Sequence, residues 1–321
     1  MSFTTFIDLL EVIGILTLLL ITGYISRRVN LIDDVGSKRL SSLIIKLGQP
    51  MMIVGALIRT DFGWDKLKTG LFFMLIGFLI HPLMIGLAWL TGPLYRDVNQ
   101  RKISLFALTF TNCGFIGFPI LDAIFPGEGS FIGAFFVIGF HIYVWTLGIY
   151  ILGKGRDDVK LTPQKAFLNP GTVPCVIGLG LYLLKAVVPF PQFTIDFTVS
   201  LYAICMPISV LITGALIAKQ GLIRMARTPS LYVFNAIKLL GIPLVVCLVA
   251  KLVTLGMADS YNTILFCTVI AALPSGATIS MLGEMYDISP EYAAQCVCSS
   301  SILSIGTLPL LYFIGDLIAK L

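Results

Sequence analysis

The chain has few charged residues. Only 12% of its 321 residues are Asp, Glu, Lys or Arg and 57% are hydrophobic, whereas about a quarter of a soluble domain is charged. No soluble core could bury that much apolar surface. The apolar residues also lie in runs of roughly 20, the length that an α-helix needs to cross about 30 Å of hydrocarbon. The composition therefore predicts an all-α protein that crosses a membrane many times.

Residues for catalysis and metal binding are scarce as well. The chain has two histidines, and none of its seven cysteines forms a C-x-x-C pair or a Cys/His ligand spacing. It lacks a Ser/His/Asp or metal-ligand cluster, so we expect neither an enzyme nor a metal or cofactor. Lys and Arg form no large cluster, which argues against nucleic acid as a partner.

Ten membrane spans are predicted from the apolar runs between charged or Pro/Gly-rich breaks. If the loops alternate sides, fourteen Lys and Arg residues fall on one side and six on the other. Because basic loops stay in the cytoplasm, we expect a multi-pass protein of the cell (inner or plasma) membrane with both termini outside. The approximate spans are 6–26, 38–58, 66–91, 100–124, 129–152, 167–187, 195–219, 229–255, 260–284 and 290–318.

An internal repeat relates the two halves of the chain. Several short matches recur in order at an offset near 160 residues, although chance matching in Leu- and Gly-rich sequence is the alternative. We expect one five-helix repeat in 1–156 and a second in 157–321. Because five is odd, the second copy inserts with inverted topology, as in many secondary transporters. The matches are Pro50 and Gly55–Ile58 with Pro207 and Gly214–Ile217, Pro82-Leu83 with Pro243-Leu244, and Thr146-Leu147 with Thr307-Leu308.

The fourth and ninth spans are predicted to be broken helices, because Gly, Pro and polar residues interrupt both near mid-membrane. Backbone groups freed at that depth survive only inside protein or against a wet cavity. Two half-helix N-termini would then aim their N–H groups at one point, which suits a carboxylate. Kinks relieved by a neighbouring helix are the structural alternative. The candidate substrate-binding residues are Asn112, Cys113, Gly114, Pro274, Ser275 and Gly276, with the hydroxyls of Thr111 and Thr278 beside them.

Four further polar residues lie within predicted spans. Lys46 and Lys238 could supply a counter-charge for an anion if they face the cavity, or extend to the cytoplasmic face. His81 and His141 could accept a coupling proton, or serve as neutral packing residues. All four are therefore candidates for a substrate or coupling role.

Over nearly its whole length the chain resembles the auxin efflux carrier family, which includes PIN-like plant carriers and bacterial malate or malonate permeases and is related to the bile acid/sodium symporters. The likeness is carried by Asn112 with Gly117-Phe118-Pro119-Ile120, and by Leu273-Pro274-Ser275-Gly276 followed by Glu284-Met285-Tyr286 and Pro290. The family pattern implies ten helices in two inverted repeats, with crossing fourth and ninth helices. Helices one, two, six and seven would form a scaffold that makes a homodimer, and the other six a mobile transport domain that moves as an elevator.

The resemblance also implies a substrate class. Asn112 and the Pro274-Ser275-Gly276 break would hold the carboxylate of a small mono- or dicarboxylate such as malate or malonate. Ser275 stands where the plant carriers tend to have Gln, and there is no long hydrophilic loop between spans five and six, so auxin is not the expected substrate. Three alternatives remain open: a sodium-coupled organic-anion symporter of the bile-acid type, a passive anion channel, and a sensor derived from a transporter.

Overall fold

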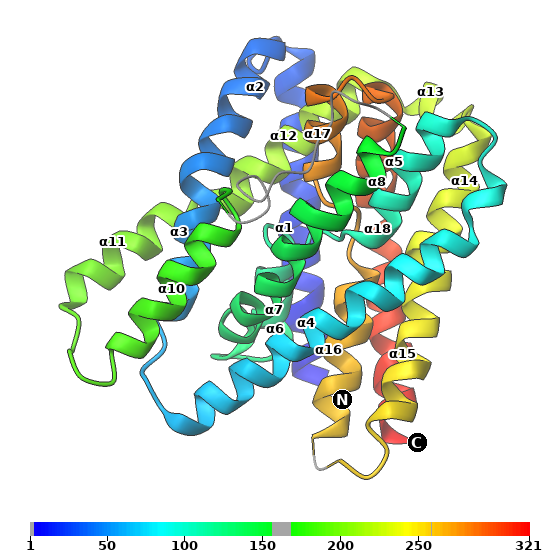
Figure 1. The fold of residues 1–321 in the computed structure, drawn as a ribbon. Helices are drawn as coiled ribbons and strands as arrows, with labels where there is room; N and C mark the ends of the chain where they lie inside the picture. The colour runs from blue at the N-terminus through cyan, green and yellow to red at the C-terminus, as the bar shows by residue number, and fades with distance from the viewer. Residues whose placement is uncertain (1–2, 156–167, 258) are drawn as a thin grey trace. The chain divides into compact units, whose positions relative to one another are not determined.

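The protein is almost entirely helical in a computed structural model that describes residues 3–155, 168–257 and 259–321 (Figure 1). Seven helices in these ranges are long and apolar enough to cross a membrane. This confirms the expectation of an all-α, multi-pass membrane protein. The seven candidate spans are Thr4–Arg28, Asp34–Ile58, Trp64–Leu94, Gly129–Gly153, Gln192–Gln220, Pro229–Val253 and Pro290–Lys320.

The other three predicted spans correspond to shorter helices. The fourth is split into α5 (Val98–Thr109) and α6 (Gly117–Ile124), and the ninth into α16 (Ser260–Ala272) and α17 (Thr278–Met285). The sixth is represented by α10 (Thr172–Leu184). Residue 167, where that span was predicted to begin, lies outside the described residues. So do the predicted repeat boundary at 156/157 and three of the cations predicted to face the cytoplasm, Arg156, Lys160 and Lys165.

Contacts divide the chain into two compact units. Unit 1 comprises Met1–Thr17, Ile80–Cys113 and Leu216–Leu321, and unit 2 comprises Leu18–Leu79 and Gly114–Ala215.

The remaining elements are α1 (Phe3–Arg28), α2 (Asp34–Leu43), η1 (Ile44–Gly48), α3 (Gln49–Ile58), α4 (Trp64–Leu90), η2 (Gly92–Leu94), α7 (Gly129–Tyr143), η3 (Val144–Gly148), α8 (Ile149–Gly153), α11 (Gln192–Ala203), α12 (Cys205–Gln220), α13 (Leu222–Ala226), α14 (Pro229–Ala236), η4 (Ile237–Gly241), α15 (Ile242–Val253) and α18 (Pro290–Lys320).

In unit 2, α3 packs against α7, α10 and α11. The helices α1 and α12 approach each other closely through two glycines. A Cβ on Gly23 would lie 2.0 Å from the Leu211 carbonyl oxygen, and one on Gly214 would lie 2.1 Å from that of Leu20. Small residues allow such close contact between membrane helices, where lipid supplies no hydrophobic driving force for packing.

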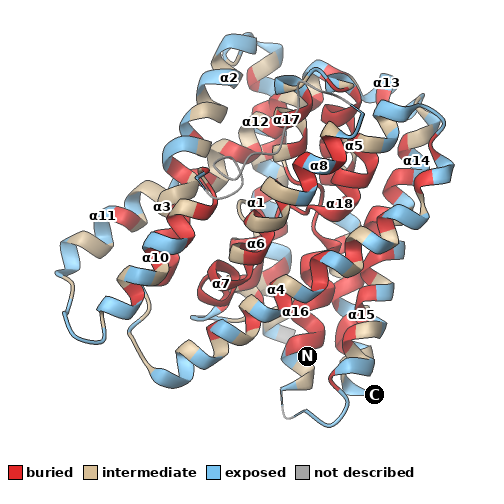
Figure 2. Ribbon diagram, viewed as in Figure 1, coloured by how far each residue is buried: buried red, intermediate tan, exposed pale blue. Residues whose placement is uncertain are grey.

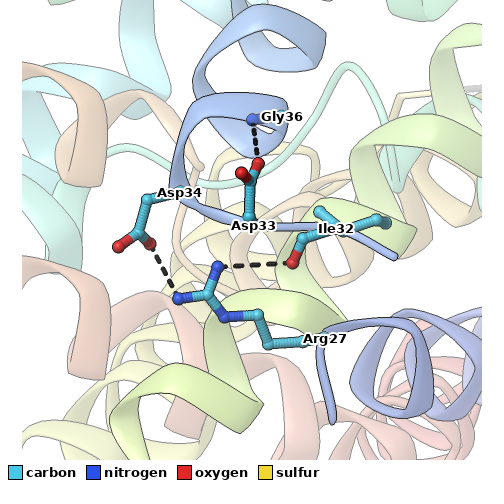
Figure 3. Close-up of polar contacts among 5 residues, drawn as sticks. All are labelled: Arg27, Ile32, Asp33, Asp34 and Gly36. Atoms are coloured by element: carbon cyan, nitrogen blue, oxygen red, sulfur yellow. Dashed lines mark hydrogen bonds and ion pairs between the residues drawn. The ribbon is translucent and has the colours of Figure 1, made fainter. Parts of the chain in front are cut away.

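The turn between α1 and α2 is held by a local polar network (Figure 3). Arg27 donates to the Ile32 carbonyl at 3.3 Å and to the Asp34 carboxylate at 2.9 Å. Asp33 caps α2 by accepting from the Gly36 N–H at 2.6 Å, which satisfies one of the free donors at the helix start. These contacts fix where the chain reverses between its first two spans.

In unit 1, α16 packs against α15 and α18, and both α5 and α17 also pack against α18. Every residue of α16 from Thr263 to Ala272 is buried, as Figure 2 shows in red. The short helix α16, which precedes the break in the ninth span, is therefore an interior element of this unit, although it is apolar enough to face lipid.

Two spans contain a π-helical turn that begins a few residues before a proline. In η1 the Gln49 N–H donates to the Ile44 carbonyl, and at η4 the Ile242 N–H donates to the Ile237 carbonyl. Each turn ends in a glycine that stands two residues before Pro50 or Pro243. Proline cannot donate to the carbonyl four residues earlier and its ring crowds that carbonyl, so a wider turn relieves the clash.

Candidate functional site

Two unwound segments meet in unit 1, and we call residues 110–113 and 273–277 together the crossing. Phe110 leaves α5 with φ −97° and ψ 105°, and Leu273 leaves α16 with φ −60° and ψ 148°. Both conformations are extended. At Leu273 the reason is local, because the residue before a proline is disfavoured from the helical region.

The crossing is an isolated antiparallel pairing of Thr111 with Ser275. The Asn112 N–H donates to the Pro274 carbonyl at 2.8 Å, and the Gly276 N–H donates to the Phe110 carbonyl at 2.9 Å. A Cβ on residue 276 would lie 3.1 Å from the Thr111 carbonyl oxygen. Glycine thus lets the two backbones come close enough to satisfy each other at membrane depth.

Ser275 is fully buried and fastens the crossing to its surroundings. Its hydroxyl donates to the Ala107 carbonyl at 2.9 Å, and its N–H donates to the Ser300 hydroxyl at 3.1 Å. The Ser275 hydroxyl, a candidate substrate ligand in the sequence, therefore already donates its hydrogen to a carbonyl in the last turns of α5. Ser275 retains only acceptor capacity in this arrangement.

Asn112 contributes a polar side chain to the crossing, and its amide is not used in the pairing of the two segments. It is 5% exposed, and within the described residues its side-chain amide has no hydrogen-bond partner. The backbone N–H and carbonyl of Thr111 point away from the pairing, and they too lack a partner in that part of the chain. Buried polar groups are normally paired, so these atoms mark a place for water or a ligand.

Lys238 lies beside the crossing and is completely buried. Its Nζ donates to the Leu108 carbonyl, in the last turn of α5, at 3.2 Å. A helix C-terminus carries partial negative charge, which favours a cation there. The ammonium has three N–H donors, and among the described residues Leu108 is its only acceptor. A buried cation with unused donors suits an anion nearby.

His81 also adjoins the crossing. Its ring is 2% exposed and stacks on Phe110, with 6.0 Å between ring centroids. Thr278 begins α17 and is partly exposed, and the N–H groups of Ala277 and Thr278 have no backbone partner in the described ranges. Cys113 is buried in the same unit. The structure therefore brings most of the candidate residues into unit 1.

Three candidates lie in unit 2. Gly114 follows Cys113 directly but belongs to that unit. Lys46 is exposed. His141 is buried, its Nε2 lies 3.1 Å from the Gln49 Nε2, and its ring packs so tightly on Gly171 that a Cβ there would be 2.1 Å from Nδ1.

Sequence reasoning missed Ser300, whose hydroxyl accepts from the Ser275 N–H. The run Cys298-Ser299-Ser300-Ser301, polar in the middle of an apolar span, was the signal that pointed to it. The carbonyls of Ala107 and Leu108 had no such signal, because backbone groups carry no sequence identity.

Comparisons with known proteins agree that the chain is similar to membrane transporters. Residues 7–312 match the family model described as Membrane transport protein. This chain belongs to that family. The match confirms the resemblance to the auxin efflux carrier family and spans both segments of the crossing, Lys238 and His81.

Two curated relatives of this membrane transport protein are both described as uncharacterised transporters. One, from Methanothermobacter thermautotrophicus, is 21% identical over 93% of this chain and 95% of its own length. The other, from Methanocaldococcus jannaschii, is 25% identical over 49% of this chain and 53% of its own length. Family and relatives thus indicate a membrane transporter rather than an enzyme.

Proposed function

We propose that the protein is a secondary carrier for small organic anions and that the crossing in unit 1 binds the substrate carboxylate. The observation that carries the proposal is the Asn112 side chain, which is 5% exposed and whose amide has no hydrogen-bond partner among the described residues, in the unit that holds Lys238. The Asn112 amide would donate to one carboxylate oxygen, and the Thr111 N–H and the first N–H groups of α17 are further donors. Mono- and dicarboxylates such as malate or malonate are the leading substrate class.

Charge supports an anion over a cation. The Lys238 ammonium is the charged group hydrogen-bonded next to the crossing, and its two unused N–H donors would be satisfied by a carboxylate or by water. Because a buried, unpaired cation costs several kcal/mol, an anion that neutralises it gains affinity. In the proposed site Ser275 shapes the crossing rather than contacting the substrate.

The transport cycle is proposed from the family resemblance. Ten spans in two inverted repeats would place the two broken helices at corresponding positions. Spans one, two, six and seven would form the dimeric scaffold, and the other six would carry the site between the two faces of the membrane. Both termini would lie outside.

The first test is thermal unfolding of the purified protein with a panel of carboxylates, because a ligand that binds only the folded state raises stability by mass action, by about 2.7 kcal/mol at 100 times Kd. We expect one class of acid to stabilise the wild type. Asn112→Ala should abolish the shift, and Asn262→Ala should retain it, since Asn262 is an exposed residue in the first turn of α16.

A second arm separates the coupling alternatives. Stabilisation that requires sodium would favour the bile-acid type of symporter. Stabilisation that survives unchanged in a folded Asn112→Ala protein would refute binding at the crossing, and no response to any carboxylate would refute the anion class.

A further inference from the structure

A groove of about 350 Å³ lies within unit 1, and neither the residues of the crossing nor Lys238 line it. It runs between α14–η4 and α18, which pack against each other, and α13 also lines it (Figure 1). Its volume falls in the range of small-molecule sites, about 300–1,000 Å³. No step of the proposed transport function uses this groove.

The body of the groove is apolar and open. Leu240 and Leu303 line it and are 39% and 49% exposed. Both residues lie in helices that are long and apolar enough to span a membrane. In a bilayer these side chains would contact lipid acyl chains, which are apolar like them.

Two polar residues, Asn235 and Ser299, interrupt the apolar lining near one end of the groove, and we call this pair the polar step. The Asn235 Nδ2 donates to the Leu231 carbonyl at 2.8 Å and to the Ser299 hydroxyl at 2.9 Å, and Asn235 Oδ1 is buried without a partner. The Ser299 hydroxyl reaches the Cys296 carbonyl only at 3.5 Å, which is too long for a good bond. The Ser299 hydroxyl is therefore a weakly bonded donor at this point of the groove, beside the buried acceptor Asn235 Oδ1.

The depth of this step matches a lipid ester. Asn235 is six residues from the start of α14, or about 9 Å along the axis at 1.5 Å per residue. We place the start of α14 in the head-group layer, which puts Asn235 at the level of the glycerol esters. The Ser299 hydroxyl can donate to an ester carbonyl, and a water that bridges the ester to Asn235 Oδ1 would satisfy the remaining acceptor.

Cations gather at the same end. Arg224 lies in α13, and Lys219 and Arg227 lie just before and after it. All three fall on the side predicted to be cytoplasmic. Arg224 pairs with Glu291 in the first turn of α18. Arg227 is exposed and has no ion pair within the described residues. The end of the groove therefore has an excess of positive charge, which complements an anionic head group.

We propose that this groove binds one anionic phospholipid, with an acyl chain along Leu240 and Leu303, an ester beside Ser299 and the phosphate at Arg227. Each Lys or Arg near an anionic lipid surface contributes about 1 kcal/mol, which corresponds to about a fivefold change in affinity.

The test uses the full chain in detergent with phosphatidylglycerol or phosphatidylcholine of identical acyl chains. Unfolding temperature and the number of retained lipids, by native mass spectrometry, are measured for the wild type and three variants. Arg227→Gln removes the head-group contact. Ala236→Phe fills the groove from an exposed lining position. Thr307→Val is the matched control, because it removes a hydroxyl at the deep end, where only chain methylenes are placed.

We expect phosphatidylglycerol to stabilise the wild type more than phosphatidylcholine and to be retained as one lipid. Arg227→Gln should weaken its retention about fivefold, Ala236→Phe should abolish it, and Thr307→Val should leave it unchanged. Equal effects of the two lipids on the wild type would overturn the head-group assignment. Retention that persists in Ala236→Phe, or a change of oligomeric state in place of lipid loss, would overturn the groove as the lipid site.

Discussion

Two lysines in similar local sequence occupy opposite environments. Lys46 lies in Ile-Ile-Lys-Leu-Gly-Gln-Pro and Lys238 in Ile-Lys-Leu-Leu-Gly-Ile-Pro, and both segments form a π turn. Lys46 is exposed, and the α2 helix before it has no buried residue. Lys238 is fully buried in a segment that packs on α18 and donates to the Leu108 carbonyl. Because the two turns are alike, the packing of the helix decides whether the lysine is buried.

The largest expected effect comes from removing the Lys238 ammonium. Lys238→Met should lower carboxylate transport at least tenfold while the protein stays folded, because a methionine fills the space and avoids the cost of a buried charge. Lys46→Met should change transport and stability little, since exposed substitutions stay within about 0.5 kcal/mol. Uptake into proteoliposomes, with unfolding temperature as the control, measures both. If the two variants lose transport equally, the contrast between the lysines has no functional meaning.

A glycine pair tests how tightly the crossing next to Lys238 must close. Gly276→Ala should reduce transport several-fold, because the new Cβ would lie 3.1 Å from the Thr111 carbonyl oxygen and push the backbones apart. Gly306→Ala in α18 meets nothing within 4 Å and should stabilise its helix by about 0.5–1 kcal/mol. Uptake rates and unfolding temperatures of both variants decide the matter, and a Gly276→Ala protein with wild-type transport would contradict the close crossing.

Lys185 provides a third lysine with a purely structural environment. Its Nζ donates to the Ile58 and Thr60 carbonyls and to Asp61, at 2.9, 3.1 and 3.0 Å. Lys185→Met should therefore destabilise the protein by about 1–3 kcal/mol, the cost of leaving partly buried acceptors unpaired. Carboxylate affinity of the folded fraction should stay the same. A stable Lys185→Met protein with lost binding would reverse the roles assigned to Lys185 and Lys238.

The smallest expected effect is a pH dependence at Asp61. The hydrogen bond and charge of Lys185 hold the Asp61 pKa below its usual 3.8. A lowered pKa stabilises the fold above pH 3.8, and this contribution is lost as the pH falls through the lowered value. Because the Asp61 side chain is 92% exposed, the effect should stay below about 1 kcal/mol. Unfolding temperatures of wild type and Asp61→Asn should differ near neutral pH and converge as the pH falls below 3.8; a gap that widens on acidification would contradict the sign.

Much of the architecture could be predicted because it follows from local chemistry. The break after Thr109 contains Gly114, and the break before Thr278 contains Pro274 and Gly276. These residue types disfavour a continuous helix whatever surrounds them. Tertiary partners could not be predicted in this way. That the Ser275 hydroxyl would donate to Ala107, or that Lys238 and not Lys46 would be buried, depends on which helix packs against which.

The most direct test of the carrier account is exchange across proteoliposomes of a carboxylate that stabilises the protein. The account predicts saturable uptake that is accelerated by the same acid inside the vesicle, lost in Asn112→Ala and Lys238→Met, and retained in Lys46→Met. Uptake that rises without saturation and ignores the internal acid would indicate a channel, and exchange that persists in Asn112→Ala would contradict transport through the crossing.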